Sequence, residues 1–109
     1  MDITVKQLSR VDLIIVEGRI DSTTAPEFGE ALGNQLGGSH NIVVDLAGVE
    51  DMSSAGLREL VTALKRAKTT GGDVRLSAPS DRVREVLDLA GLDSVFTIYD
   101  DQVDAVGSF

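Results

Sequence analysis

Residues 42–68 read IVVDLAGVEDMSSAGLRELVTALKRAK and contain the clearest strand and helix patterns of the chain. Ile42 to Leu46 form a short and mostly apolar run, typical of a strand that is covered on both faces. From Ser54 to Lys68 the apolar side chains recur every three or four residues, which predicts an amphipathic helix: Leu57, Leu60, Val61, Leu64 and Ala67. A buried strand followed by such a helix predicts an α/β fold.

Two further strands are expected before this stretch. Ile3 to Leu8 alternates apolar and polar residues, which indicates a half-buried strand at a sheet edge. Val11 to Glu17 carries a block of apolar residues and is ended by Gly18, which predicts a more central strand. Only residues 9–10 separate the two strands, so we expect them to pair antiparallel as a hairpin.

Helices and short strands alternate through the rest of the chain. A helix is predicted from Thr23 or Thr24 to Leu36, where Thr24 and Glu27 have the spacing of a capping box and two glycines follow the last turn. The remaining expected elements are a strand at 74–76, a helix opened by residues 79–80 and ended by Gly91, a strand at 95–99, and a last helical turn within 100–109.

The element order is therefore β-β-α-β-α-β-α-β with a possible terminal helix. Strands joined through helices run parallel with right-handed crossovers. We thus expect an α/β fold with a mixed, mainly parallel sheet of four to five strands, an antiparallel first strand, and three to four helices packed against it. A chain of 109 residues has room for one core, so residues 1–109 are read as a single domain.

Composition restricts the partners of this domain. Asp and Glu number 18 against 10 Lys and Arg, and the net charge is -8, so nucleic acid and anionic membranes are poor partners. Aromatic residues make up only 4%, which disfavours a platform for stacking bases or sugars. Cys is absent, which excludes disulfides and thiolate sites. We see no signal peptide, membrane span, calcium-loop spacing or cofactor motif, and expect a cytoplasmic protein without metal or cofactor.

Two polar junctions follow predicted strands, Gly18–Thr24 and Gly48–Leu57. Functional groups collect where strands of a doubly wound sheet end, and neighbouring strands would bring Asp21 and Ser54 to the same end. Ser53 or Ser54 could serve only as a helix N-cap. A helix N-terminus also stabilises a phosphate, and phosphoserine here would add about -1.5 to -2 charges beside acidic residues.

Residues 49–58, VEDMSSAGLR, resemble the signature of the STAS domain, the family of bacterial anti-sigma factor antagonists. Two other segments, in order and at suitable spacing, resemble the same family: Gly18-Arg19-Ile20-Asp21 before the first helix, and residues 90–99, AGLDSVFTIY, as the closing helix and strand. The three segments together extend the resemblance across nearly the whole chain.

The resemblance implies a partner-switching protein that is not an enzyme and has no catalytic residue. In this family the unphosphorylated antagonist captures an anti-sigma factor, itself a serine/threonine kinase, and thereby frees the sigma factor. Phosphorylation by that kinase ends the capture, and a serine phosphatase restores it. The modified position falls on Ser54, with Ser53 as the alternative, and the implied partner surface comprises Asp21, Ser22, Thr23, Asp51, Met52, Ser53, Gly56, Leu57 and Arg58.

This chain departs from the family pattern at one place. Many members carry Asp directly before the modified serine, where this chain has Ser53, and Ala55 stands at the second serine position. The nearest acid is then Asp51, which leaves Ser53 and Ser54 as alternatives for the modified residue.

Rival functions lack the residues they need. A serine hydrolase requires a base near its nucleophile, but His40 is the only histidine and is expected in a turn at the far end of the strand. No glycine-rich loop with a lysine precedes a helix, and an acyl carrier protein would be all-helical. The remaining alternative is a STAS scaffold or accessory subunit, in a signalling assembly or transporter, without serine phosphorylation.

Overall fold

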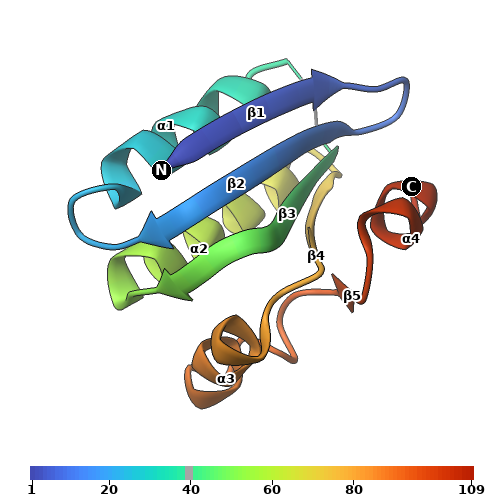
Figure 1. Cartoon of the computed structure of the whole chain (residues 1–109). Coiled ribbons are helices and arrows are strands. Elements are labelled where there is room, and N and C mark those ends of the chain that lie inside the picture. Colours follow the sequence, from blue (N-terminus) through green and yellow to red (C-terminus); the bar gives the residue numbers. More distant parts are fainter. Residues whose placement is uncertain (39–40) are drawn as a thin grey trace.

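A twisted five-stranded sheet forms the centre of the computed structural model, which describes residues 1–38 and 41–109 (Figure 1). The strand order is β1-β2-β3-β4-β5, with β1 antiparallel to β2 and the other neighbours parallel. The bounds are β1 Asp2–Gln7, β2 Asp12–Ile20, β3 Asn41–Met52, β4 Asp73–Ser77 and β5 Ile98–Tyr99. The predicted α/β class, the antiparallel first strand and the parallel remainder are confirmed; His40 lies outside the described residues.

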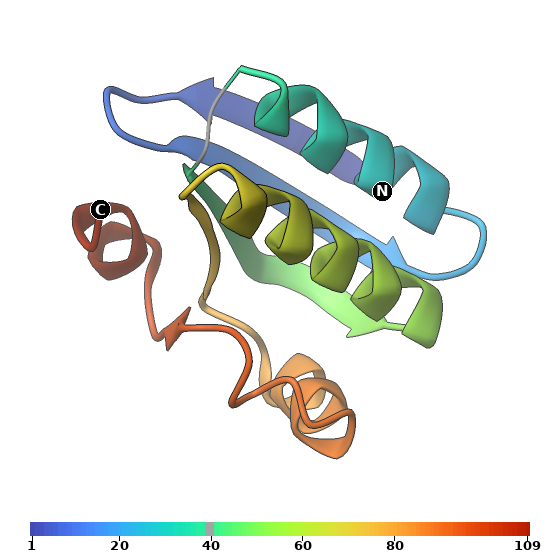
Figure 2. The ribbon, with the colours of Figure 1, turned by 180° about the vertical axis from the view of Figure 1, so that it is seen from behind.

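The two faces of the sheet carry different helices. The helices are α1 Ala25–Leu36, α2 Ser54–Thr69, α3 Asp81–Leu89 and α4 Gln102–Gly107. Figure 2 shows α1 and α2 side by side across one face, and two side chains of α3, Val83 and Leu87, join the same core. On the opposite face, Ala105 of α4 packs with a separate apolar cluster of Val11, Leu13 and Val43.

Successive side chains of a strand point to opposite faces of the sheet, and this alternation produces the two cores. In β2, Ile14 and Val16 are fully buried under α1 and α2, whereas Leu13 points to the α4 side. On α2 the predicted apolar stripe is buried at Leu60 and, two helical turns later, at Ala67. The helical periodicity of the sequence therefore identified the correct face.

Both central strands run further than the sequence predicted. Gly18 does not end β2, because β2 and β3 continue to pair from Gly18 opposite Val49 as far as Ile20 opposite Met52. The register shifts between Gly18 and Arg19, and Gly18 has a φ of +105°, a conformation that favours glycine. Residues 48–52, predicted to be a loop, are therefore strand, and α2 follows after one residue.

Other boundaries also differ from the prediction. Thr24 is the N-cap of α1, but its side chain makes no cap bond, so the predicted capping box with Glu27 is wrong. Its hydroxyl instead donates to the carbonyl of Arg19 at 2.9 Å, which ties the preceding turn together. The last strand is limited to Ile98–Tyr99, because the chain before it forms a turn in which Phe96 is buried.

Candidate functional site

The candidate site lies at the carboxyl ends of β2 and β3. Arg19 is opposite Asp51, and the amide of Ser53 donates to the carbonyl of Ile20 at 2.8 Å. This bond joins the turn that contains Asp21 to the start of α2, so the predicted proximity of the two junctions is confirmed. Between them lies a hollow of about 50 Å³, lined by Arg19, Ile20, Asp21, Asp51, Met52 and Ser53.

Asp21 organises the turn between β2 and α1. Its Oδ1 accepts the amide of Thr23 at 2.9 Å and the amide of Thr24 at 3.1 Å. These bonds, that of Thr24 first, lower the pKa of Asp21 below its usual value of 3.8, and the charge of Arg19 adds a smaller effect. Asp21 is therefore a carboxylate at neutral pH. The hydrogen bonds that it accepts come from the turn in which it lies.

Ser53 occupies the N-cap position of α2 but does not cap it. Its backbone has the extended geometry of an N-cap, with φ -87° and ψ 173°, yet its side chain makes no cap hydrogen bond. The hydroxyl oxygen is buried and has no hydrogen-bond partner among the described residues. This oxygen is therefore closed to solvent.

Ser54 is the first residue of α2, and it is exposed. The helical bonding begins at the amide of Leu57, which donates to the carbonyl of Ser53 at 3.1 Å. The amides of the turn before Leu57 lie at the positive end of the helix dipole and have no intrahelical acceptor. A hydroxyl at this place is accessible, and the site favours an added negative charge.

Two residues of the predicted partner surface lie beneath it. Met52 is 2% exposed, and Gly56 is also buried. A Cβ on Gly56 would lie 2.6 Å from Cγ2 of Ile20 and 2.8 Å from Cγ of Met52, so the close packing of α2 on the strand ends requires glycine here. The residues of this turn that reach the surface are Ser54 and Arg58, with Leu57 half-buried.

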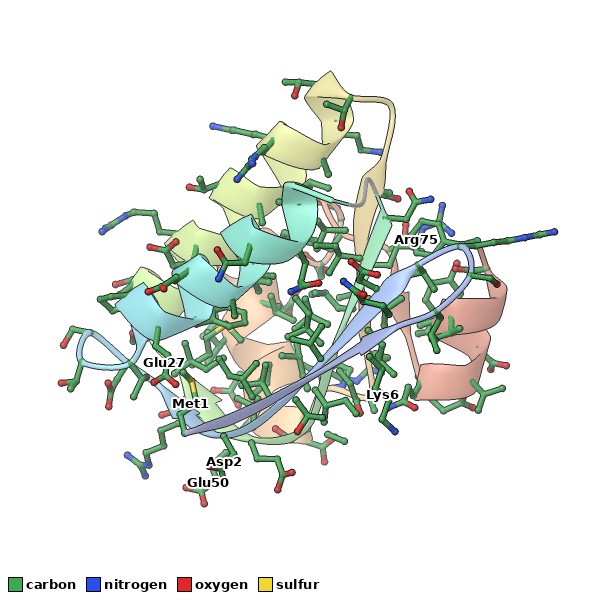
Figure 3. The ribbon with its side chains drawn as sticks, turned by 90° about the horizontal axis from the view of Figure 1, so that it is seen from above. Met1, Asp2, Lys6, Glu27, Glu50 and Arg75 are labelled. Atoms are coloured by element: carbon green, nitrogen blue, oxygen red, sulfur yellow. The ribbon has the colours of Figure 1, made fainter. Side chains whose placement is uncertain are left out.

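Ion pairs flank the site, and neither of their two arginines was predicted as a site residue from the sequence. Nε of Arg19 lies 3.5 Å from Oε2 of Glu50, which projects into solvent from the end of β3 (Figure 3). Nε of Arg82 on α3 lies 3.2 Å from Oδ1 of Asp51. Nothing in the local sequence pattern connects Arg82 with Asp51, because they are separated by 31 residues and meet only in the folded chain.

The hollow at the site is small. Its volume of about 50 Å³ is well below the ~300 Å³ at which ligand pockets begin. Across residues 1–38 and 41–109, no three acidic or histidine side chains gather to hold a metal ion. In the same described part of the chain, no helix is long and apolar enough to cross a membrane.

The exposed serine hydroxyl at the start of α2 and the acidic turn beside it lie on a mixed α/β sheet whose first strand is antiparallel. The family model described as the STAS domain matches residues 2–105, and the chain belongs to the STAS domain family.

Several proteins similar to this chain are named anti-sigma factor antagonists. The anti-sigma-B factor antagonist of Staphylococcus epidermidis is 30% identical over 84% of this chain and 88% of its own length. That of Bacillus subtilis is 29% identical over 90% of each chain. Among solved structures, an anti-sigma factor antagonist from Mycobacterium paratuberculosis superposes with a TM-score of 0.89 at 29% identity, covering 98% of this chain and 92% of the other.

Proposed function

We propose that this chain is an anti-sigma factor antagonist whose binding is switched off by phosphorylation of Ser54. In the unphosphorylated form it binds an anti-sigma factor that is a serine kinase, and the sigma factor held by that kinase is released. The kinase then transfers the terminal phosphoryl group of ATP to Oγ of Ser54, whose proton leaves, and a serine phosphatase later hydrolyses the phosphate.

The proposal rests on the different solvent exposure of the two adjacent serines. Ser54 is exposed at the first position of α2, whereas the hydroxyl oxygen of Ser53 is buried. A kinase needs its acceptor hydroxyl in line with the phosphoryl group, which only an accessible side chain can satisfy. Accessibility therefore favours Ser54 over Ser53.

The charges around Ser54 explain how a phosphate could end an interaction without unfolding the domain. Glu50 and Asp51 are each paired with an arginine, but Arg82 is shared with Glu85 and Asp21 adds a third carboxylate to the hollow. A phosphate adds about -1.5 to -2 charges, which the amides and dipole of α2 stabilise. A partner docked over Ser54 would instead meet new bulk and unpaired negative charge.

Phosphate mapping tests the modified residue directly. The purified chain is incubated with a candidate anti-sigma kinase and ATP, and mass spectrometry locates the phosphate in the wild type, in Ser53→Ala and in Ser54→Ala. We expect one phosphate in the wild type and in Ser53→Ala, and none in Ser54→Ala. Ser53→Ala is the matched control, because it removes the neighbouring hydroxyl without touching the exposed one.

The opposite result would overturn the assignment. Phosphate retained in Ser54→Ala and lost in Ser53→Ala would place the switch on Ser53. Tight binding of a kinase or ATPase partner without any serine modification would favour the scaffold or accessory-subunit function.

A further inference from the structure

Strand β1 leaves one long edge of the sheet open. It is the outermost strand, and five of its six residues are exposed, Ile3 being the exception. In Figure 3, which looks down on this edge, no other described element lies over β1. Helix α1 packs against β2 and β3 on one face of the sheet and leaves the outer backbone edge of β1 free. Such an edge presents unpaired backbone amides and carbonyls with which a strand of another chain can pair.

The hairpin geometry determines which backbone groups of β1 point outward. The amide of Leu8 donates to the carbonyl of Val11 at 3.0 Å, so Leu8 and Val11 are a hydrogen-bonded pair. Such pairs alternate along an antiparallel ladder, and the register then directs the amides and carbonyls of Lys6, Thr4 and Asp2 toward β2. The corresponding groups of Ile3, Val5 and Gln7 point away from the sheet.

We propose that two copies of this chain associate through β1, edge to edge and antiparallel, with the two-fold axis passing through Thr4. This register places Asp2 opposite Lys6 of the second copy, twice by symmetry, and Ile3 opposite Val5 of the second copy. The outward groups of residues 3 and 5 then face each other, so they form hydrogen-bonded pairs.

Charge and apolar contacts both favour this register. Asp2 and Lys6 lie toward opposite ends of β1, on the same side of the strand (Figure 3). A shift by one residue would set outward backbone groups against groups already bonded to β2. A shift by two would leave Asp2 or Lys6 facing Thr4 and lose both charge pairs. The register also covers Val5, which is 37% exposed in the single chain.

The assembly would be a continuous ten-stranded sheet that keeps both candidate sites accessible. Because the axis is perpendicular to the sheet, β2 and its symmetry mate run in opposite directions. The two Ser54 residues then lie at opposite ends of the assembly, and each could be approached by its own partner. The pairing of the two copies does not depend on phosphorylation, so a failure of this proposal would leave the proposed function untouched, and the reverse also holds.

Disulfide cross-linking of single-cysteine variants tests this register directly, because the native chain contains no cysteine. In the proposed dimer, residue 4 faces itself in a non-hydrogen-bonded pair with Cα atoms about 4.5 Å apart, within the reach of a disulfide. Thr4→Cys is therefore expected to form a covalent dimer with oxidised glutathione. Lys6→Cys is the matched control: its two copies would lie more than about 13 Å apart, and it should stay monomeric.

Charge exchange tests the same pairing without a cross-link. Lys6→Asp and Asp2→Lys each replace two attractive pairs with two repulsive ones, and sedimentation equilibrium should show association weakened about tenfold. The double variant Asp2→Lys/Lys6→Asp restores opposite charges and should recover the wild-type constant. Thermal unfolding of every variant verifies that the single chain remains folded.

Three results would overturn the proposal. They are a wild type that stays monomeric at millimolar concentration, equal cross-linking of Thr4→Cys and Lys6→Cys, or a double variant that associates no better than either single one. Loss of Ser54 phosphorylation would leave this test unaffected.

Discussion

Ser53→Ala should leave the stability of the protein unchanged or raise it, although the residue is a serine at a helix N-cap. A serine that caps a helix contributes about 1 kcal/mol, with a range of about 0.5–2 kcal/mol, which alanine removes. The Ser53 hydroxyl makes no such bond and is buried without a partner. Removing an unsatisfied buried hydroxyl recovers up to about 1–3 kcal/mol of desolvation, so the expected change is zero or positive.

Ser80 provides the matched control within the same chain. It is the N-cap of α3, and its hydroxyl accepts the amide of Val83 at 3.2 Å. Ser80→Ala should therefore lose about 1 kcal/mol. For a domain of this size that loss lowers the melting temperature by roughly 4 °C.

Urea unfolding followed by far-UV circular dichroism measures both variants, since the chain has no Trp and one Tyr for fluorescence. We expect the midpoint of Ser80→Ala to fall and that of Ser53→Ala to equal or exceed the wild type, at constant slope. If Ser53→Ala loses as much stability as Ser80→Ala, then Ser53 caps α2 in solution. The accessibility argument that separates it from Ser54 would then fail.

Three further perturbations test other parts of the structure. Gly56→Ala should lose about 1–3 kcal/mol in urea unfolding, because the added Cβ would lie 2.6 Å from a side-chain carbon, whereas Gly107→Ala meets nothing within 4 Å and should not destabilise. The pKa of the Asp21 carboxyl, measured by NMR, should lie below 3.8. The difference in unfolding free energy between the wild type and Asp21→Ala should be largest above the unfolded-state pKa and should disappear as the pH falls through the lower folded-state pKa. Arg75→Ala removes bonds of 2.8 and 2.7 Å to Ser108, so amide exchange should accelerate in α4 while α1 and α2 stay protected.

Much of the fold was predictable because its core follows simple periodicities. The apolar run at 42–46 and the repeat through α2 identified a buried strand and the inward face of a helix, and both are confirmed at Val44 and Leu60. The turn at residues 9–10 was short enough to require a hairpin, and Leu8 bonds to Val11 across it.

The ends of the central strands were not predictable from local pattern. Gly48 and Asp51 resemble a loop, yet they are held in β3 by pairing with β2, a contact between segments about thirty residues apart. The same limit applies within the site. Sequence places two serines at a helix start, but only packing decides that the Ser53 hydroxyl is buried while Ser54 is exposed.

The phosphate switch is tested by the affinity of one purified anti-sigma kinase for the unmodified and for the fully phosphorylated chain. Titration calorimetry of both forms, with thermal unfolding to show that each is folded, isolates the effect of the phosphate. We expect tight binding of the unmodified chain and at least a hundredfold loss, about 2.7 kcal/mol, on phosphorylation at Ser54. Equal affinity of the two forms would contradict the account.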